Sequence, residues 1–175
     1  MRGASDVSAA VGLVISFLVF FSPFARAATR TDIVVGPGPT AAADHDAVAA
    51  AVAMLPTQPV RIAVWDVMQN RPPVRDYLLT LDAFTVEGNG VIYVVQQSTV
   101  LKGARADSRV FRAMLATIIW HEMAHLDGKD EHGARKAEEE LWSRFARDGV
   151  CDQTTALRYL QALSKRPDDT ALARR

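Results

Sequence analysis

The stretch Ile118-Ile119-Trp120-His121-Glu122-Met123-Ala124-His125 is the starting point for interpreting this sequence. On an α-helix each residue is turned by about 100° from the one before, so His121 and His125 lie about 40° apart and one turn apart along the axis. Both imidazoles can therefore reach one metal ion. Glu122 lies about 100° from His121, which makes it a poor third ligand. From there it can still reach a water on the ion and act as a general base.

The helix that carries this stretch is predicted to begin after Ser108, a good N-terminal cap, and to end near Asp127, with Gly128 as its stop. Several apolar side chains fall in the same sector of the helical wheel as the two histidines: Val110, Phe111, Met114 and Ile118. The histidines are therefore expected to face the protein interior. The alternative, two hydrogen-bonded core histidines without a metal, leaves the glutamate between them unexplained.

A catalytic zinc ion takes three protein ligands and keeps one position open. The candidates for the third ligand lie on a helix predicted from Glu131 to Asp148, with Asp130 as its cap. Glu131 and Glu138 border the apolar stripe of that helix, where a carboxylate needs a partner, whereas His132 points away.

Distance along the helix axis favours one of the two glutamates. The short connection 126–129 should bring Glu131 level with His125, whereas Glu138 lies about 10 Å further along the axis. We therefore expect Glu131 as the third ligand, and Glu138 as an acceptor for a ligand histidine. The assignment reverses, with Glu138 as the ligand, if the second helix begins later or the two helices splay apart.

The segment His121-Glu122-Met123-Ala124-His125 resembles the H-E-x-x-H motif of the zincin metallopeptidases. Gly128 also matches the metzincin branch, but Glu131 stands where that branch has a histidine, and no methionine follows Met123. Two histidines with a helix-borne glutamate are more similar to the gluzincin branch. The stretch 131–134 (EHGA) resembles the Glu-x-x-Ala element of some small gluzincins, although Arg135 replaces the aspartate that usually follows.

This resemblance implies a zinc metallopeptidase with one Zn²⁺ ion and a peptide or protein substrate. Glu122 would take a proton from the zinc-bound water as it attacks the peptide carbonyl, and would pass it to the leaving amine. The sequence offers three possible donors to the developing oxyanion, between which it does not distinguish: Tyr93, Arg135 and Tyr159. The alternative function is a non-catalytic, zinc-stabilised binding module or secreted interaction factor on the same fold, although such a module has no use for Glu122.

The sequence predicts an α+β fold, a small zincin-like domain with a short mixed sheet. Strands are expected over 33–35 and 60–67, and an antiparallel hairpin over 83–86 and 91–97 around Asn89-Gly90. Further helices are predicted over 41–55, with Thr40 as cap, and over 154–163, while 74–81 is either a short helix or an extended connection. In zincins an edge strand above the metal helix binds the extended substrate. Residues 91–96 are either that edge strand or an interior strand.

The ends of the chain are expected to lie outside the domain. An apolar run at 9–21 followed by Ala25-Arg26-Ala27 is typical of a cleaved signal peptide, residues 1–27, so the protein is expected to be periplasmic or secreted. Residues 28–164 then form one domain, and 165–175 form a polar, disordered tail.

The composition argues against two kinds of partner. Twenty basic and twenty acidic residues cancel, so the chain has no excess charge to attract nucleic acid or an anionic membrane. Cys151 is the single cysteine, which excludes an internal disulfide, and it is interpreted as a buried small apolar residue.

Overall fold

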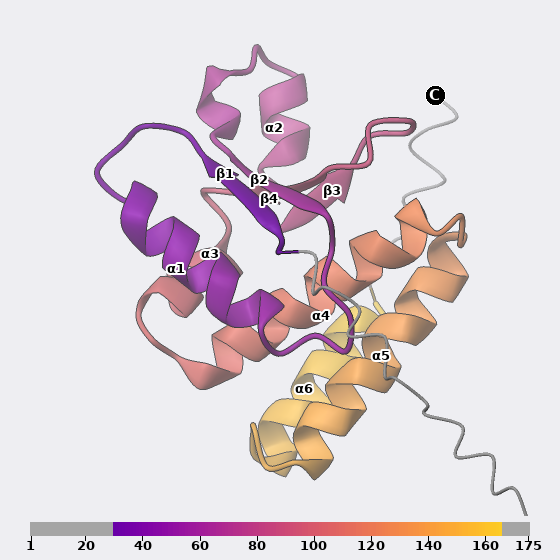
Figure 1. Ribbon diagram of the computed structural model, residues 1–175. Coiled ribbons are helices and arrows are strands. Elements are labelled where there is room, and N and C mark those ends of the chain that lie inside the picture. Colours follow the sequence, from indigo (N-terminus) through magenta and orange to yellow (C-terminus); the bar gives the residue numbers. More distant parts are fainter. Residues whose placement is uncertain (1–29, 166–175) are drawn as a thin grey trace, which may run out of the picture.

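The computed structural model of the chain describes residues 30–165 (Figure 1). The predicted signal peptide, 1–27, and residues 166–175 of the predicted tail lie outside this range. Helices pack on a four-stranded mixed sheet, which confirms the predicted α+β class. Between residues 30 and 165, none of the helices combines the length and the apolar character that a membrane span requires.

The sheet has the strand order β1-β2-β4-β3. The strands β1 (Asp32–Val35), β2 (Arg61–Trp65) and β4 (Ile92–Val95) run parallel to one another. The last strand, β3 (Ala83–Thr85), pairs antiparallel with β4, so the predicted hairpin is confirmed. Gly90 lies in its turn with φ +66°, a conformation that glycine adopts without steric cost.

Residues 91–96 were predicted to form either an edge strand or an interior strand of the sheet. The structure shows an interior strand. β4 lies between β2 and β3, because the hairpin folds β3 back onto the side of β4 that would otherwise be the edge. The strand at the edge is β3, and the helix that carries His121 packs directly against it. The edge next to the histidines therefore belongs to the first strand of the hairpin and not to the second.

One face of the sheet is covered by α1 (Ala41–Val52), α3 (Thr99–Arg105) and α4 (Arg109–Leu126). Side chains from this face and from these helices form the main core, including Val48, Ile62, Ile92, Val94, Leu101, Leu115 and Ile119, all of them fully buried. A short 3-10 helix, η1 (Val67–Gln69), and α2 (Val74–Leu78) pack with Val95 in a smaller cluster at the other side. The stretch 74–81 thus contains a short helix.

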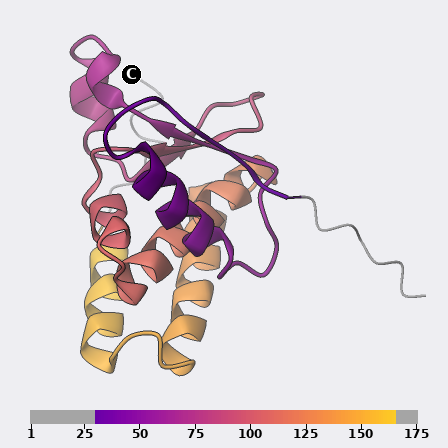
Figure 2. The same ribbon diagram turned by 60° about the vertical axis from the view of Figure 1, so that its left-hand side comes forward.

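The last two helices extend the molecule away from the sheet (Figures 1 and 2). α5 (Glu131–Arg147) packs along α4, and α6 (Gln153–Leu163) returns antiparallel to α5. The amphipathic stripe of α5 is buried in this arrangement, with Leu141 and Trp142 almost without exposed surface. The helices that follow the histidines therefore form a second layer on the far side of α4.

Two of the three predicted helix caps are confirmed. The side chain of Ser108 accepts a hydrogen bond from the backbone N–H of Phe111, and Asp130 accepts one from Gly133. The prediction that Thr40 caps α1 is wrong, because its hydroxyl donates to the Asp44 carboxylate at 2.7 Å instead. Helix α3 was not predicted, since its seven residues are too short a window for a periodic pattern.

Asp44 is a fully buried carboxylate at the centre of a polar network that joins α1, α3 and the end of β4. Its partners are Arg105, whose Nε lies 3.3 Å from Oδ1, and Gln96, which donates to Oδ2 at 2.9 Å. Arg105 also donates to the backbone carbonyl of Gln96 at 3.1 Å. We call Thr40, Asp44, Gln96 and Arg105 the Asp44 network. It joins three elements of the fold through an ion pair whose two members both belong to this chain.

Candidate metal centre

The connection between α4 and α5 places the candidate ligands side by side. Gly128 ends α4 with φ +81°, and the backbone N–H of Lys129 bonds to the carbonyl of Ala124 at 2.9 Å. The Asp130 cap then starts α5 at Glu131. The chain reverses within four residues, so the first turn of α5 lies level with the last turn of α4.

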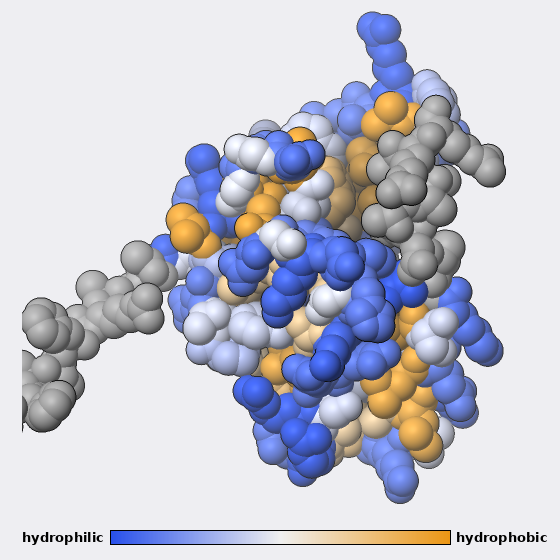
Figure 3. Space-filling model, turned by 90° about the vertical axis from the view of Figure 1, so that its right-hand side faces the viewer, coloured by the Kyte–Doolittle hydropathy of each residue, from blue (hydrophilic) through white to orange (hydrophobic). Residues whose placement is uncertain are grey.

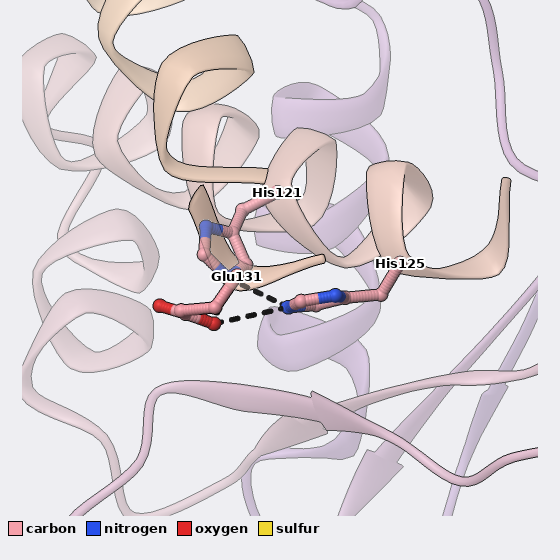
Figure 4. Close-up of side chains that lie close together, drawn as sticks. All are labelled: His121, His125 and Glu131. Atoms are coloured by element: carbon pink, nitrogen blue, oxygen red, sulfur yellow. Dashed lines mark hydrogen bonds and ion pairs between the residues drawn. The ribbon is translucent and has the colours of Figure 1, made fainter. Parts of the chain in front are cut away.

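Three side chains from these two helices converge on one point (Figure 4). The Nε2 atoms of His121 and His125 are 3.1 Å apart. The Oε2 atom of Glu131 lies 3.2 Å from Nε2 of His125 and 3.5 Å from Nε2 of His121. His121, His125 and Glu131 are the residues that we call the metal centre.

Each of the two imidazoles has an oxygen acceptor close to its Nδ1 atom. Nδ1 of His125 lies 3.0 Å from the carbonyl oxygen of Lys129, which can only accept, so Nδ1 carries the proton. Nδ1 of His121 lies 3.0 Å from the Glu138 carboxylate, which also accepts. In the neutral imidazoles both Nε2 atoms then present lone pairs to each other and to Glu131. Three acceptors at this distance repel one another unless a cation lies between them.

The spacing of these acceptors fits zinc. Zinc binds histidine nitrogen and carboxylate oxygen at about 2.0–2.2 Å in a tetrahedral arrangement, which separates two ligand atoms by about 3.4 Å. The three distances between the acceptors, 3.1, 3.2 and 3.5 Å, match one face of such a tetrahedron. Two imidazoles and one carboxylate are also a donor set that zinc uses in catalytic sites.

The two glutamates of α5 occupy different positions around the histidines. Glu131 faces the convergence point with Oε2, while its Oε1 accepts a hydrogen bond from Nε of Arg135 at 2.7 Å. Glu138 is fully buried and contacts His121 from the opposite side of the ring, at Nδ1. Glu131 thus lies where the sequence places the third ligand, and Glu138 lies on the Nδ1 side of His121. That Glu131 binds a metal and Glu138 supports a ligand histidine stays a prediction.

The electrostatics of the metal-free centre favour a positive charge. Burial lowers the pKa of His121, but the carboxylates of Glu131 and Glu138 outweigh it and raise the pKa to about 9. Hydrogen bonding to Glu131 raises the pKa of His125. The contacts with the two histidines hold the pKa of Glu131 well below its usual range. The carboxylates around the two histidines therefore favour a positive charge at this position.

Glu122 lies beside the metal centre and faces an open cleft. It is 7% exposed, and burial raises the pKa of its carboxyl group, an effect that His121 and His125 partly offset. Thr85 on β3 hydrogen-bonds to it. A raised pKa is typical of a carboxylate that exchanges a proton during catalysis.

The cleft runs between β3, α2 and the end of α4 and has a volume of about 930 Å³. Its apolar lining includes Tyr77, Leu81, Phe84, Val86 and Leu126, and Glu87 is the acidic residue on its strand side. Figure 3 shows one side of the molecule, which is mainly hydrophilic with hydrophobic side chains in separate patches. The metal centre and Glu122 form part of the wall of this cleft.

The other residues considered from the sequence lie away from the centre. His132 is exposed, and His45 is an exposed neighbour of Asp46, as its flanking aspartates suggested. Cys151 is partly buried and packs at the border of the main core.

The three suggested oxyanion donors are now distinguished by their contacts. Tyr93 stacks on Phe84, and its hydroxyl accepts a hydrogen bond from Asn89. Arg135 is bonded to Glu131, and the hydroxyl of Tyr159 donates to Glu138 in the interior. Two cleft residues were missed from the sequence, Thr85 and Tyr77, because their place beside the histidines depends on how β3 and α2 pack.

Comparisons of the chain with models of protein families, with curated proteins and with solved structures found no match.

Proposed function

We propose that this protein is an exported zinc-dependent metallopeptidase that hydrolyses peptide bonds at the metal centre. The observation that carries the proposal is the convergence of two histidine lone pairs and one carboxylate at tetrahedral spacing, next to the buried carboxylate of Glu122. A purely structural zinc site is closed by four protein ligands. Three ligands at the wall of an open cleft leave a position for water and substrate.

When bound, zinc supplies Lewis-acid chemistry, polarising the substrate carbonyl and lowering the pKa of a water. Glu122 takes the proton of the attacking water and passes it to the leaving amine, a role that suits a carboxylate whose pKa is raised by burial. A hydrogen bond from Thr85 partly offsets this rise in the pKa of Glu122. Arg135 holds Glu131 through Oε1, so that Oε2 stays directed at the two histidines.

The substrate that suits the cleft is an extended peptide with apolar side chains. Among the described residues, β3 has β4 on one side and no strand on the other, so its outer edge can pair with a peptide backbone. That strand lines the cleft together with Glu122 and the metal centre. Tyr77, Leu81 and Leu126 would surround the side chains of the bound peptide.

The proposal is tested on purified residues 28–175, with the bound metal measured and a mixed peptide library assayed. We expect one zinc ion per chain, cleavage next to apolar residues, and loss of cleavage by about 10²–10⁴-fold in Glu122→Gln with zinc retained, the usual range for a general base. His132→Gln, an exposed neighbour of the centre, is the matched control and should behave as wild type.

Two outcomes would count against this function. If zinc binds but neither wild type nor Glu122→Gln cleaves any peptide, the chain is a zinc-stabilised binding module. If Glu138→Ala removes the metal while Glu131→Ala keeps it, the ligand assignment is wrong even though the zinc site is real.

A further inference from the structure

A buried chain of polar side chains leads from the metal centre to the last helix. Nδ1 of His121 lies 3.0 Å from Oε2 of Glu138, and the other oxygen of Glu138 accepts a hydrogen bond from the hydroxyl of Tyr159. The oxygen of that hydroxyl is 3.0 Å from the Thr117 hydroxyl. His121, Glu138 and Tyr159 lie on α4, α5 and α6, and none is more than 9% exposed.

The direction of these hydrogen bonds follows from the available protons. An ionised carboxylate has no proton and accepts from both sides, so the one proton of the Tyr159 hydroxyl goes to Glu138. On the other side, Oε2 of Glu138 lies 3.0 Å from Nδ1 of His121, close enough to pair with a proton on that nitrogen. In the neutral imidazole with its proton on Nδ1, Nε2 of His121 is the lone pair that faces His125 and Glu131.

Tyr159 is itself held firmly. Its ring packs on that of Trp142, with 4.3 Å between the centroids, and Trp142 donates from Nε1 to the backbone carbonyl of Ala156 on the same helix as Tyr159. Trp142 is fully buried, one turn after Glu138 on α5. The position of the Tyr159 hydroxyl is therefore fixed by the packing of α6 against α5.

We propose that Tyr159 is a positioning residue for the metal centre: by holding Glu138, it fixes the ring orientation and the tautomer of His121, so that the zinc affinity depends on the docking of α6. This inference rests on the proposed function, because it requires that His121 binds zinc. It assigns the Tyr159 hydroxyl a role in metal binding and removes it from the oxyanion donors.

The test compares Tyr159→Phe, which removes one hydroxyl, with Tyr93→Phe, which removes a tyrosine hydroxyl bonded to Asn89 near the sheet surface. Zinc affinity is measured by competition with a chelator, and Co²⁺ is used as a spectroscopic probe of the ligand geometry. We expect Tyr159→Phe to weaken zinc binding by about tenfold or more and to alter the visible spectrum of bound Co²⁺, as loss of an outer partner of a metal ligand does. Tyr93→Phe should change neither.

Glu138→Gln provides a second variant of nearly the same size, expected to weaken zinc binding by about 10–100-fold. Because Tyr159 acts through Glu138, the double variant should bind zinc no more weakly than Glu138→Gln alone. A purely structural role would lower the unfolding temperature of Tyr159→Phe without moving the affinity or the Co²⁺ spectrum. If Tyr159→Phe does not fold, wild-type zinc affinity in Glu138→Gln overturns the inference.

The outcomes separate this inference from the proposed function. If the wild-type chain binds neither zinc nor Co²⁺, both are wrong. If the wild type binds zinc and Tyr159→Phe binds it equally well with the same Co²⁺ spectrum, the metal centre stands and the role of Tyr159 is refuted.

Discussion

The Asp44 network and the metal centre both bury carboxylates, but they differ in how the charges are balanced. Asp44 has no exposed surface and faces the guanidinium of Arg105, with further hydrogen bonds from Gln96 and Thr40. Its negative charge is cancelled by a residue of the same chain. Such a network needs no ligand, and it joins helices to the sheet.

Around the metal centre the balance is different. Glu122, Glu131 and Glu138 are all buried, and Arg135 contributes one guanidinium. With the three carboxylates ionised and the two histidines neutral, as ligands of a metal would be, these side chains sum to −2. A divalent cation between His121 and Glu131 would bring this sum to zero. The two regions thus differ in one respect: Arg105 balances the charge of Asp44, whereas the carboxylates around His121 and His125 outnumber the one guanidinium near them.

The strongest effect on stability is expected in the Asp44 network. Asp44→Ala leaves the partly buried Arg105 without its charge partner, and loss of one member of a buried ion pair lowers the free energy of unfolding by about 3–5 kcal/mol. Urea unfolding should give this loss equally with zinc and with EDTA. The control is Asp32→Ala, which breaks an exposed pair with Arg61 and should cost less than about 1 kcal/mol. A loss in Asp44→Ala that disappears on adding zinc would contradict the distinction between the two regions.

Metal removal should affect the metal centre alone. Zinc at about 1,000 times its dissociation constant should raise the free energy of unfolding by about 4 kcal/mol, because the folded state binds it and the unfolded state does not. The increment should vanish in the variant with both His121→Ala and His125→Ala. It should persist in Asp44→Asn, which keeps the size of the side chain. Zinc stabilisation that survives loss of both histidines would place the metal elsewhere.

The stabilisation that zinc adds to the folded state should increase with pH. The pKa of His121 is raised from 6.5 to about 9 in the metal-free chain, so the stability from its proton is fully present below pH 6.5 and is lost as the pH rises through 9. Zinc must displace this proton, so its apparent affinity should rise up to about tenfold per pH unit in that window. Chelator competition at pH 6.5 and 8.5 measures this. A flat profile would mean that no proton occupies the centre.

The smallest effect is expected from Thr85→Val. The variant removes the hydrogen bond to Glu122 and keeps the shape of the side chain, so kcat/KM should fall by about tenfold, as for a bond of about 1.4 kcal/mol. Zinc content should not change, because Thr85 does not contact the metal centre. The control is Thr80→Val, whose hydroxyl bonds to the carbonyl of Tyr77 outside the centre. Equal activity of the two variants would remove Thr85 from the site.

The local parts of the site were predictable from the sequence. The spacing of His121 and His125 fixes their common helix face, and the Ser108 and Asp130 caps fix where the two helices begin. Gly128 ends the first helix and the connection to the second helix is short. Helix geometry then brings Glu131 level with His125. These features depend on neighbours within a few residues along the chain.

Features that depend on packing between distant segments were not predictable. The hairpin was expected, but which of its strands forms the edge depends on β4 pairing with β2 from 30 residues earlier in the chain. The contact between Thr85 and Glu122 and the position of Tyr77 in the cleft follow from that pairing. Periodicity within a strand does not encode its neighbours, so no local pattern contained this information.

The sequence by itself determined that two histidines share one face of a capped helix, that a glutamate directly follows the first of them, and that a second glutamate follows within reach. The tertiary structure alone decided that Glu131 turns toward both Nε2 atoms, that Glu138 supports His121 from behind, and that Tyr159 supports Glu138. The physical reason is the separation along the chain over which each interaction acts. Helix geometry and caps act over a few residues, whereas the orientation of a buried side chain is set by whichever distant groups complete its hydrogen bonds and its charge.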